Sequence, residues 1–291
     1  MRIGLVCMLK GKGMKKGFTG IKALENMSIN EIERRASEAA LYNIEYNLEC
    51  LEWIKNYGKG LFRVSSSIIP YSDFWSWKNF DKILIKLEEL KKFAKDNNIR
   101  LIMHPDQFTV INSEREDVVL NSIKILNHHY EISELLGIED IIIHTGSSKG
   151  NYKERFINNV TLLDEKLRNK ILLENCHNVC IEDVLEICEK TNIRPCIDFH
   201  HDRINPSSQN FEVYIQKIFE LSKNKVPLAH ISSPLGVDKK NFKSHSEYIY
   251  HEDLIEFQKY FDIFDMEIEA KGKELAVKKV IDFFKSNRNL I

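Results

Sequence analysis

Six short apolar segments of this sequence each lead directly into a histidine or an acidic residue, and both residue types bind metals. The pattern is densest at RPCIDFHHD, where Asp198 follows an apolar pair and precedes His200 and His201. The residues at the six segment ends are His104, His144, Glu174, Asp198, His230 and Glu269. One histidine at such a position is usually a hydrogen-bonded structural residue. Six such side chains in one place would cost several kcal/mol of desolvation unless a cation bound them, so together they predict a metal site.

The predicted site combines imidazoles and carboxylates, and this mixture suits Zn²⁺, Mn²⁺ or Fe²⁺ better than Mg²⁺ or Ca²⁺. His201 and His245 are additional candidates and bring the set to eight ligands. Because one tetrahedral or octahedral ion takes fewer, the sequence predicts a cluster of two or three divalent metals. Clustered metals lower the pKa of bound water from about 15.7 to about 7 and clamp the attacking and leaving oxygens of an in-line displacement. Phosphodiester hydrolysis needs this chemistry most, because its substrate is anionic and weakly electrophilic.

Eight short apolar segments alternate with amphipathic ones, and they predict the elements that would position these side chains. The expected strands are residues 3–8, 61–64, 99–103, 140–143, 170–173, 194–198, 226–229 and 263–268. Short apolar strands of this kind are typical of a parallel sheet covered on both faces. Eight strand–helix units predict a (β/α)8 TIM barrel of the α/β class, with right-handed crossovers. A doubly wound open sheet is the alternative, although the G-x-G-x-x-G turn of its dinucleotide-binding form is missing after the first strand.

The helices are predicted from apolar periodicity and from their start and stop residues. An S-x-x-E capping box at Ser28 and Glu31 starts a helix that ends near Gly58, and a second box at Ser113 starts one that stops near Gly137. The remaining expected helices are residues 80–96, 153–167, 181–191, 208–223, 253–260 and 273–285. We find no linker or change of composition and expect a single catalytic domain over residues 1–291. In a barrel of this type the C-terminal strand ends share one face, so the six ligands would converge there.

The overall composition sets few limits on function. A net charge of -1 gives no global attraction to nucleic acid, and 43% hydrophobic and 29% charged residues are ordinary for a soluble globular protein. The six cysteines form no C-x-x-C pair, which indicates a reduced, intracellular compartment. The N-terminal apolar stretch is too short for a signal peptide, and no apolar run is long enough to span a membrane.

Basic and aromatic residues occur in the loops that would surround the metal site. The basic residues of these loops are Lys10, Lys12, Lys15, Lys16, Lys149, Lys153, Arg155, Arg203, Lys239, Lys240, Lys243, Lys271 and Lys273. A nucleic-acid enzyme needs phosphate contacts at this rim, and a merely solvated rim is the alternative. The polar and aromatic loop residues are Tyr71, Phe74, Trp75, Trp77, Gln107 and Phe108. Their aromatic rings would either wedge into a base stack or pack in the core.

Eight segments, in order along nearly the whole chain, resemble the UV-damage endonuclease family. They are RVSSSIIPYSDF (63–74), HPDQF (104–108), IIIHTG (141–146), LENCH (173–177), IDFHH (197–201), HISSP (230–234), HSEYI (245–249) and EIEAKGKE (267–274). The resemblance implies a TIM barrel with a cluster of up to three divalent metals, commonly manganese, with zinc or magnesium as alternatives. It also implies nicking of double-stranded DNA immediately 5′ to a UV photoproduct, either a cyclobutane pyrimidine dimer or a 6-4 photoproduct.

The resemblance also implies roles for individual residues. Its metal ligands fall on His104, His144, Glu174, Asp198, His201, His230, His245 and Glu269. Gln107 and Phe108 fall on a Gln-Tyr pair that probes the damaged strand in the family, and the phenylalanine keeps the stacking face without the hydroxyl. The expected catalytic residues are Glu174, Glu269 and His230, and the further expected DNA contacts are Arg63, Lys149, Lys153 and Lys271. The expected protein is a cytoplasmic, nucleoid-associated monomer with no organic cofactor and no membrane contact.

Three positions depart from the family pattern. The family often carries Tyr and Asn as lesion probes where this sequence has Leu5 and Leu9, and a lysine, sometimes modified, at the position of Leu228. We do not transfer those roles. Two other activities remain open on the same type of barrel: an abasic-site endonuclease, and a metal-dependent sugar isomerase or epimerase. The second would need a closed pocket without affinity for DNA.

Overall fold

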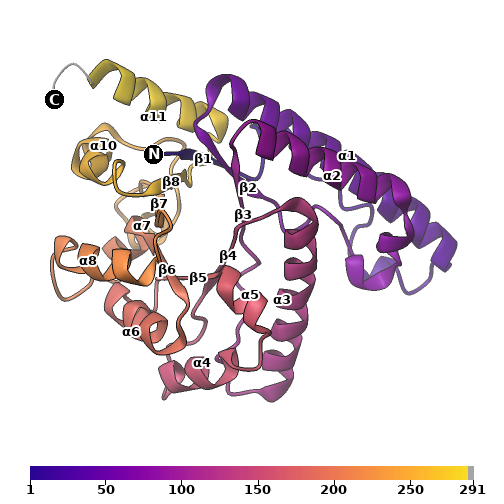
Figure 1. Cartoon of the computed structure of the whole chain (residues 1–291), viewed down its shortest axis with the longest axis horizontal. Helices are drawn as coiled ribbons and strands as arrows, with labels where there is room; N and C mark the ends of the chain where they lie inside the picture. The colour runs from indigo at the N-terminus through magenta and orange to yellow at the C-terminus, as the bar shows by residue number, and fades with distance from the viewer. Residues whose placement is uncertain (288–291) are drawn as a thin grey trace.

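A computed structural model, which describes residues 1–287, shows a closed barrel of parallel strands in the order of the sequence, with helices around it (Figure 1). The strands are β1 (Ile3–Val6), β2 (Gly60–Val64), β3 (Arg100–Met103), β4 (Asp140–His144), β5 (Ile171–Glu174), β6 (Arg194–Asp198), β7 (Leu228–Ile231) and β8 (Asp265–Ile268). The predicted (β/α)8 barrel is therefore confirmed, and the open sheet is excluded because β8 pairs with β1. The expected domain boundary at residue 291 lies outside the described residues.

The α-helices follow the strands, and within residues 1–287 three of the connections contain more than one α-helix. They are α1 (Ile29–Tyr57), α2 (Asp81–Asp96), α3 (Glu116–Leu136), α4 (Tyr152–Val160), α5 (Glu165–Lys170), α6 (Ile181–Thr191), α7 (Phe199–Ile204), α8 (Glu212–Leu221), α9 (Lys239–Phe242), α10 (His251–Phe257) and α11 (Glu274–Asn287). The predicted Ser28 cap is confirmed, because its side chain accepts a hydrogen bond from the backbone N–H of Glu31. Among residues 1–287, no helix combines the length and the apolar character that crossing a membrane requires.

Three local predictions were wrong. The second capping box does not form, because α3 begins one residue after Arg115, and Ser113 instead accepts a hydrogen bond from the Arg115 backbone. The single helix expected over residues 153–167 is two helices, because Asp164 adopts an extended conformation and caps α5. The first strand ends at Val6 rather than at residue 8, because Cys7 adopts a positive φ of 61° that ends the extended backbone.

The barrel interior is built in layers, because inward-facing side chains recur at every second residue of a strand. Along β3 and β4 the inward sequences are Arg100, Ile102, His104 and Asp140, Ile142, His144. The middle layer is one buried apolar cluster made of Leu61, Ile102, Ile142, Leu172, Cys196 and Leu228. Gly4 of β1 leaves room for this layer, since a Cβ there would lie 2.7 Å from the Leu61 side chain. The layer separates two sets of buried charges.

The base of the barrel, at the first residues of the strands, holds a network of paired charges. Arg100 binds Asp140 through Nη2 at 2.6 Å and Asp265 through Nη1 at 2.8 Å. Arg194 is a second partner of Asp140, and Arg2 is a second partner of Asp265 at 3.2 Å. The two carboxylates are almost completely buried. Arginines neutralise both carboxylates, so the buried charges of the base are balanced without a bound ion.

Candidate metal centre

Glu174, the last residue of β5, lies at the centre of the opposite face, which we call the mouth. Its Oε2 lies 2.9 Å from Nε2 of His104 and 2.9 Å from Nε2 of His144. Its Oε1 lies 3.1 Å from Nδ1 of His230 and 3.3 Å from Nδ1 of His201. The structure thus brings four of the predicted imidazoles onto one buried carboxylate, as expected from strand ends that share one face.

Asp198 and His201 are positioned by the short helix α7, which directly follows β6. Asp198 caps this helix by accepting a hydrogen bond from the backbone N–H of His201 at 2.7 Å. The cap places His201 Nδ1 3.5 Å from the second carboxylate oxygen, Oδ2. The His200 ring lies 6.1 Å from that of Phe242 and 5.6 Å from that of His245, and both of its nitrogens are buried without a hydrogen-bond partner among residues 1–287. The predicted candidate His201 thus lies beside both Glu174 and Asp198.

Glu269 and His245 close the mouth on the β8 side. Glu269 Oε1 lies 3.7 Å from Nδ1 of His230, and Oε2 lies 3.7 Å from Nε2 of His245. The loop that carries His245 is held by Gly272, whose backbone N–H donates to the Glu247 carbonyl at 2.8 Å. A Cβ at Gly272 would lie 2.3 Å from that carbonyl oxygen, so only glycine allows this approach.

The sequence reasoning missed one buried carboxylate of the mouth, Glu267. This side chain lies beneath Glu269 on the same strand face, is fully buried and binds the guanidinium of Arg63. Its Oε2 also lies 3.0 Å from Nε2 of His230. The signal was present in the sequence as the spacing Glu-Ile-Glu, since residues two apart in a strand face the same way. Arg63 in turn binds Glu269 at 2.5 Å, so it lies at the floor of the mouth.

The pKa values of the cluster reflect the balance between burial and the charges of neighbouring side chains. Burial opposes ionisation of Glu174, but the imidazoles of His230 and His144 outweigh it and hold its pKa well below the usual range. Burial raises the pKa of Asp198, and the negative charge of Glu174 adds to this, against His201. Burial would lower the pKa of His201, but Asp198 and Glu174 raise it to about 10. The imidazole of His201 therefore holds a proton at a place where a metal cation could bind.

The donor set fits divalent metals. Oδ2 of Asp198 is buried and has no hydrogen-bond partner among residues 1–287, although it faces His201 and His230. Three groups offer ligand atoms within 4.8 Å of one another: His104, His144 and Glu174; Glu174, Asp198 and His230; and His230, Glu267 and Glu269. Mixed nitrogen and oxygen donors of this kind bind Zn²⁺, Mn²⁺ or Fe²⁺. Several of these donor atoms lie in direct contact with one another.

A cavity of about 710 Å³ opens above the cluster. Its walls include Arg63, Gln107 and Phe108 together with His104, Glu174 and Glu269. Phe108 is 76% exposed, so its ring stands free beside the cluster. Of the predicted DNA-binding lysines, Lys149 and Lys271 are exposed, whereas Lys153 binds Asp183 and Glu186 at 2.6 Å each. None of these lysines lines the cavity within the described part of the chain.

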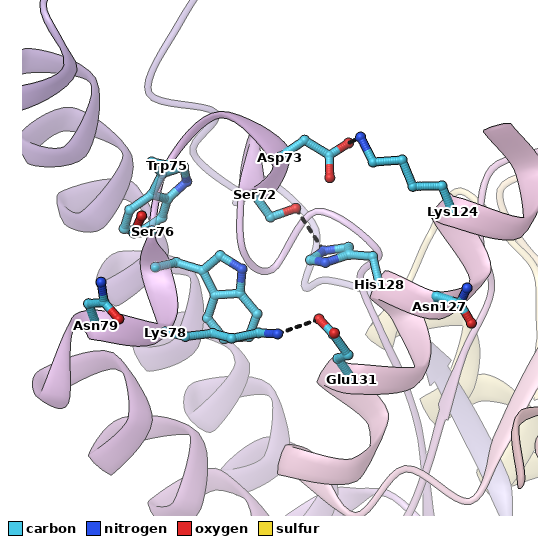
Figure 2. A pocket seen from close by; sticks show the side chains of 11 residues that line it. Ser72, Asp73, Trp75, Ser76, Lys78, Asn79, Lys124, Asn127, His128 and Glu131 are labelled. Carbon is cyan, nitrogen blue, oxygen red and sulfur yellow. Dashed lines mark hydrogen bonds and ion pairs between the residues drawn. The ribbon is translucent and has the colours of Figure 1, made fainter.

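The aromatic loop after β2 is mostly packed rather than free. Trp75 and Trp77 are buried, and the Trp75 indole donates to the Pro70 carbonyl at 2.9 Å. Figure 2 shows the loop lying against α3, where Ser72 contacts His128 at 2.7 Å and Lys78 binds Glu131 at 2.7 Å. For the two tryptophans, core packing is therefore the observed alternative. Phe74 remains 41% exposed.

The positions that depart from the family pattern are apolar in their surroundings. Leu5 and Leu228 are buried in the barrel, and Leu9 is half-buried with its N–H donating to the Tyr46 hydroxyl at 2.8 Å. His177, the last residue of the LENCH segment, also lines the cavity, and its ring lies 4.6 Å from that of His201.

Comparison with known proteins gives consistent matches over the whole chain. The model of the family described as UV-endonuclease UvdE matches residues 1–290. A UV DNA damage endonuclease of Bacillus anthracis (strain A0248) is 32% identical over 286 residues, covering 92% of this chain and 89% of that protein.

Two solved structures share the architecture. The crystal structure of SacUVDE superposes with a TM-score of 0.88 at 29% identity, covering 100% of both chains. Endonuclease IV from Thermus thermophilus superposes with a TM-score of 0.62 at 14% identity, covering 98% of both chains. At that identity, the second match shows the common barrel fold alone.

Proposed function

Because this chain belongs to the UV-endonuclease UvdE family, we propose that it repairs UV-damaged DNA by nicking the backbone immediately 5′ to cyclobutane pyrimidine dimers and 6-4 photoproducts. The observation that carries the proposal is the convergence of four imidazoles on Glu174 beneath an open cavity with an exposed aromatic ring. Family membership favours this reading over the sugar isomerase. The abasic-site endonuclease differs only in the lesion and is separated by experiment.

The cluster would hold two or three divalent ions, with Mn²⁺ as the first choice and Zn²⁺ or Mg²⁺ as alternatives. The proposed ligands are His104, His144, Glu174, Asp198, His201, His230, His245 and Glu269. Bound there, such ions supply an acidified water and neutralise the charge that develops on the phosphate and the leaving 3′-oxygen. No organic cofactor is needed for this chemistry.

The chain's own residues orient this centre. Glu174 and His230 form its core, with both side chains almost inaccessible to solvent, so their positions are fixed by packing before substrate arrives. Glu269 is 15% exposed at the cavity wall. Burial would raise the pKa of Glu269, but Arg63 and His230 hold it far below its usual value. Glu269 is therefore ionised and presents a carboxylate oxygen, Oε2, toward His245 as a proposed metal ligand.

Damage recognition would come from the rim. A dimer is read only after bending or extrusion, which weakened stacking at the lesion makes less costly. Phe108 would stack on the exposed base and Gln107 would hydrogen-bond beside it, filling the gap. Lys149 and Lys271 are exposed and would bind phosphates, whereas Lys153 would first have to leave Asp183 and Glu186. We also propose that this one barrel acts as a monomer in the cytoplasm, at the nucleoid.

The test is nicking of UV-irradiated plasmid with Mn²⁺, beside unirradiated plasmid. Cleavage sites on an oligonucleotide with one dimer should map to the bond 5′ of the lesion, and an abasic oligonucleotide should be cut more slowly. Glu269→Gln should abolish the nicking. Equal cutting of irradiated and unirradiated DNA, or an unaffected Glu269→Gln variant, would contradict the proposal.

A further inference from the structure

We propose that Glu267, clamped by Arg63, is a positioning residue that sets the orientation of His230 and Glu269 toward the metals. This inference rests on the proposed metal centre. It concerns a residue pair that lies beneath the ligands. The two residues are 204 positions apart in the sequence and meet at the floor of the mouth.

The first observation is that the guanidinium of Arg63 already lies within one of the three groups of potential metal ligands. Its Nη2 contacts Glu267 and lies 2.5 Å from Glu269 Oε1 and 3.2 Å from His230 Nε2. The guanidinium thus stands where a cation would stand in the group of His230, Glu267 and Glu269. Arg63 and Glu267 are both buried, at 8% and 0% exposure. This group is therefore neutralised from inside the protein.

The second observation is that the two edges of the His230 ring face different partners. Nε2 lies 3.0 Å from Glu267, 3.2 Å from Arg63 and 3.6 Å from the Cys196 thiol. Nδ1 lies 3.1 Å from Glu174, 3.7 Å from Glu269 and 3.9 Å from Asp198. Holding the Nε2 edge fixes where the Nδ1 edge points, which is how carboxylate partners orient ligating histidines.

The third observation concerns Glu269, which shares Arg63 with Glu267. Both carboxylates lie on the inward face of β8, separated by Ile268. With Arg63 bound to Oε1, Oε2 of Glu269 stays directed toward His245. The guanidinium of Arg63 therefore fixes the position of Glu269, a proposed metal ligand, relative to the structural carboxylate of Glu267.

The experiment compares Mn²⁺ affinity, from the EPR signal of free Mn²⁺, with the melting temperature of the metal-free protein. The double variant Arg63→Met, Glu267→Met replaces the buried pair by apolar side chains of similar length, and such replacements are often neutral for stability. We expect a metal-free melting temperature close to that of the wild type. Mn²⁺ affinity should fall by roughly 10- to 100-fold, the usual effect of losing a partner that orients a ligand.

The single variant Glu267→Gln keeps a hydrogen-bonding group against His230 and should bind Mn²⁺ with intermediate affinity. The matched control is Arg194→Met, which removes a buried arginine from the base. It should lower the melting temperature and leave Mn²⁺ affinity unchanged.

Unchanged Mn²⁺ affinity in the double variant overturns the inference. If that variant does not fold, unchanged affinity in Glu267→Gln overturns it equally. An equal loss of affinity in Arg194→Met would show a general structural effect and would also overturn it. A wild-type protein that binds no divalent metal would instead refute the proposed metal centre.

Discussion

The mouth and the base of this barrel both bury charged side chains, yet they balance them differently. At the base, Asp140 and Asp265 face the arginines Arg2, Arg100 and Arg194. At the mouth the carboxylates are Glu174, Asp198, Glu267 and Glu269, and Arg63 is the arginine among them. The base contains its own counter-ions, whereas the mouth must take cations or protons from solution. The sign balance of buried charges, rather than burial itself, thus distinguishes a structural network from a binding site.

The largest effect should follow from Glu174→Gln, which weakens the electrostatic centre of the mouth. We expect nicking of irradiated plasmid to fall by at least on the order of 10³-fold, comparable with the loss of a preorganised electrostatic group. The metal-free protein should also lose some stability, because the imidazoles that hold Glu174 ionised lose their charged partner. Glu189→Gln, on the exposed surface of α6, is the control and should cleave normally. A Glu174→Gln variant that nicks normally would remove the contrast with the base.

Asp140→Asn makes the corresponding change at the base, where arginines balance the carboxylate. It leaves Arg194 and part of Arg100 without a buried counter-ion, which costs roughly 3–5 kcal/mol of unfolding free energy. Chemical denaturation would measure the loss. Mn²⁺ affinity of the folded variant should match that of the wild type, because the apolar layer separates the two networks. A parallel fall in affinity would mean that the base and the mouth are coupled.

Metal binding should stabilise the whole chain. With Mn²⁺ at about 100 times Kd, the free energy of unfolding rises by about 2.7 kcal/mol per site if the unfolded chain does not bind. Thermal melts with Mn²⁺ and after addition of EDTA measure the difference. In Glu174→Gln the shift should shrink, while in Asp140→Asn it should keep its size. Equal shifts in both variants would place the metal outside the mouth.

The smallest effect is the release of a proton from His201. In the metal-free folded protein its pKa is raised to about 10, because Asp198 and Glu174 outweigh burial, against an ordinary value of 6.5. The stabilisation from this proton is complete below about pH 6.5 and is lost as the pH rises through about 10. A metal must displace the proton, so Mn²⁺ affinity should rise with pH between about 7 and 9. Calorimetry in buffers of different ionisation enthalpy counts the protons released, and no release would contradict the assignment.

The sequence predicted the barrel and the convergence of its ligands because apolar strands and their terminal residues follow a simple period. It missed Glu267, because each strand was searched only for the residue at its end. It also missed the base, where Arg100, Asp140 and Arg194 begin strands rather than end them. The orientation of His201 depends on the helical turn that Asp198 caps. The ion pairs of Lys153 depend on the position of α6, which carries Asp183 and Glu186. Such details depend on contacts between different helices and strands, and the apolar periodicity of the sequence carries no information about these contacts.

The seam between β1 and β8 has a consequence for how the protein is made. The backbone N–H of Arg2 bonds to Asp265 at 2.9 Å, across 263 positions of sequence, and Ile3 pairs with Met266. Contacts of such separation form late in folding, since a long loop must first be closed. The strand that seals the barrel also carries Glu267 and leads into Glu269. A growing chain therefore acquires its complete set of ligands only after nearly all of it has been synthesised, and early fragments present an open, partial centre to cellular metals.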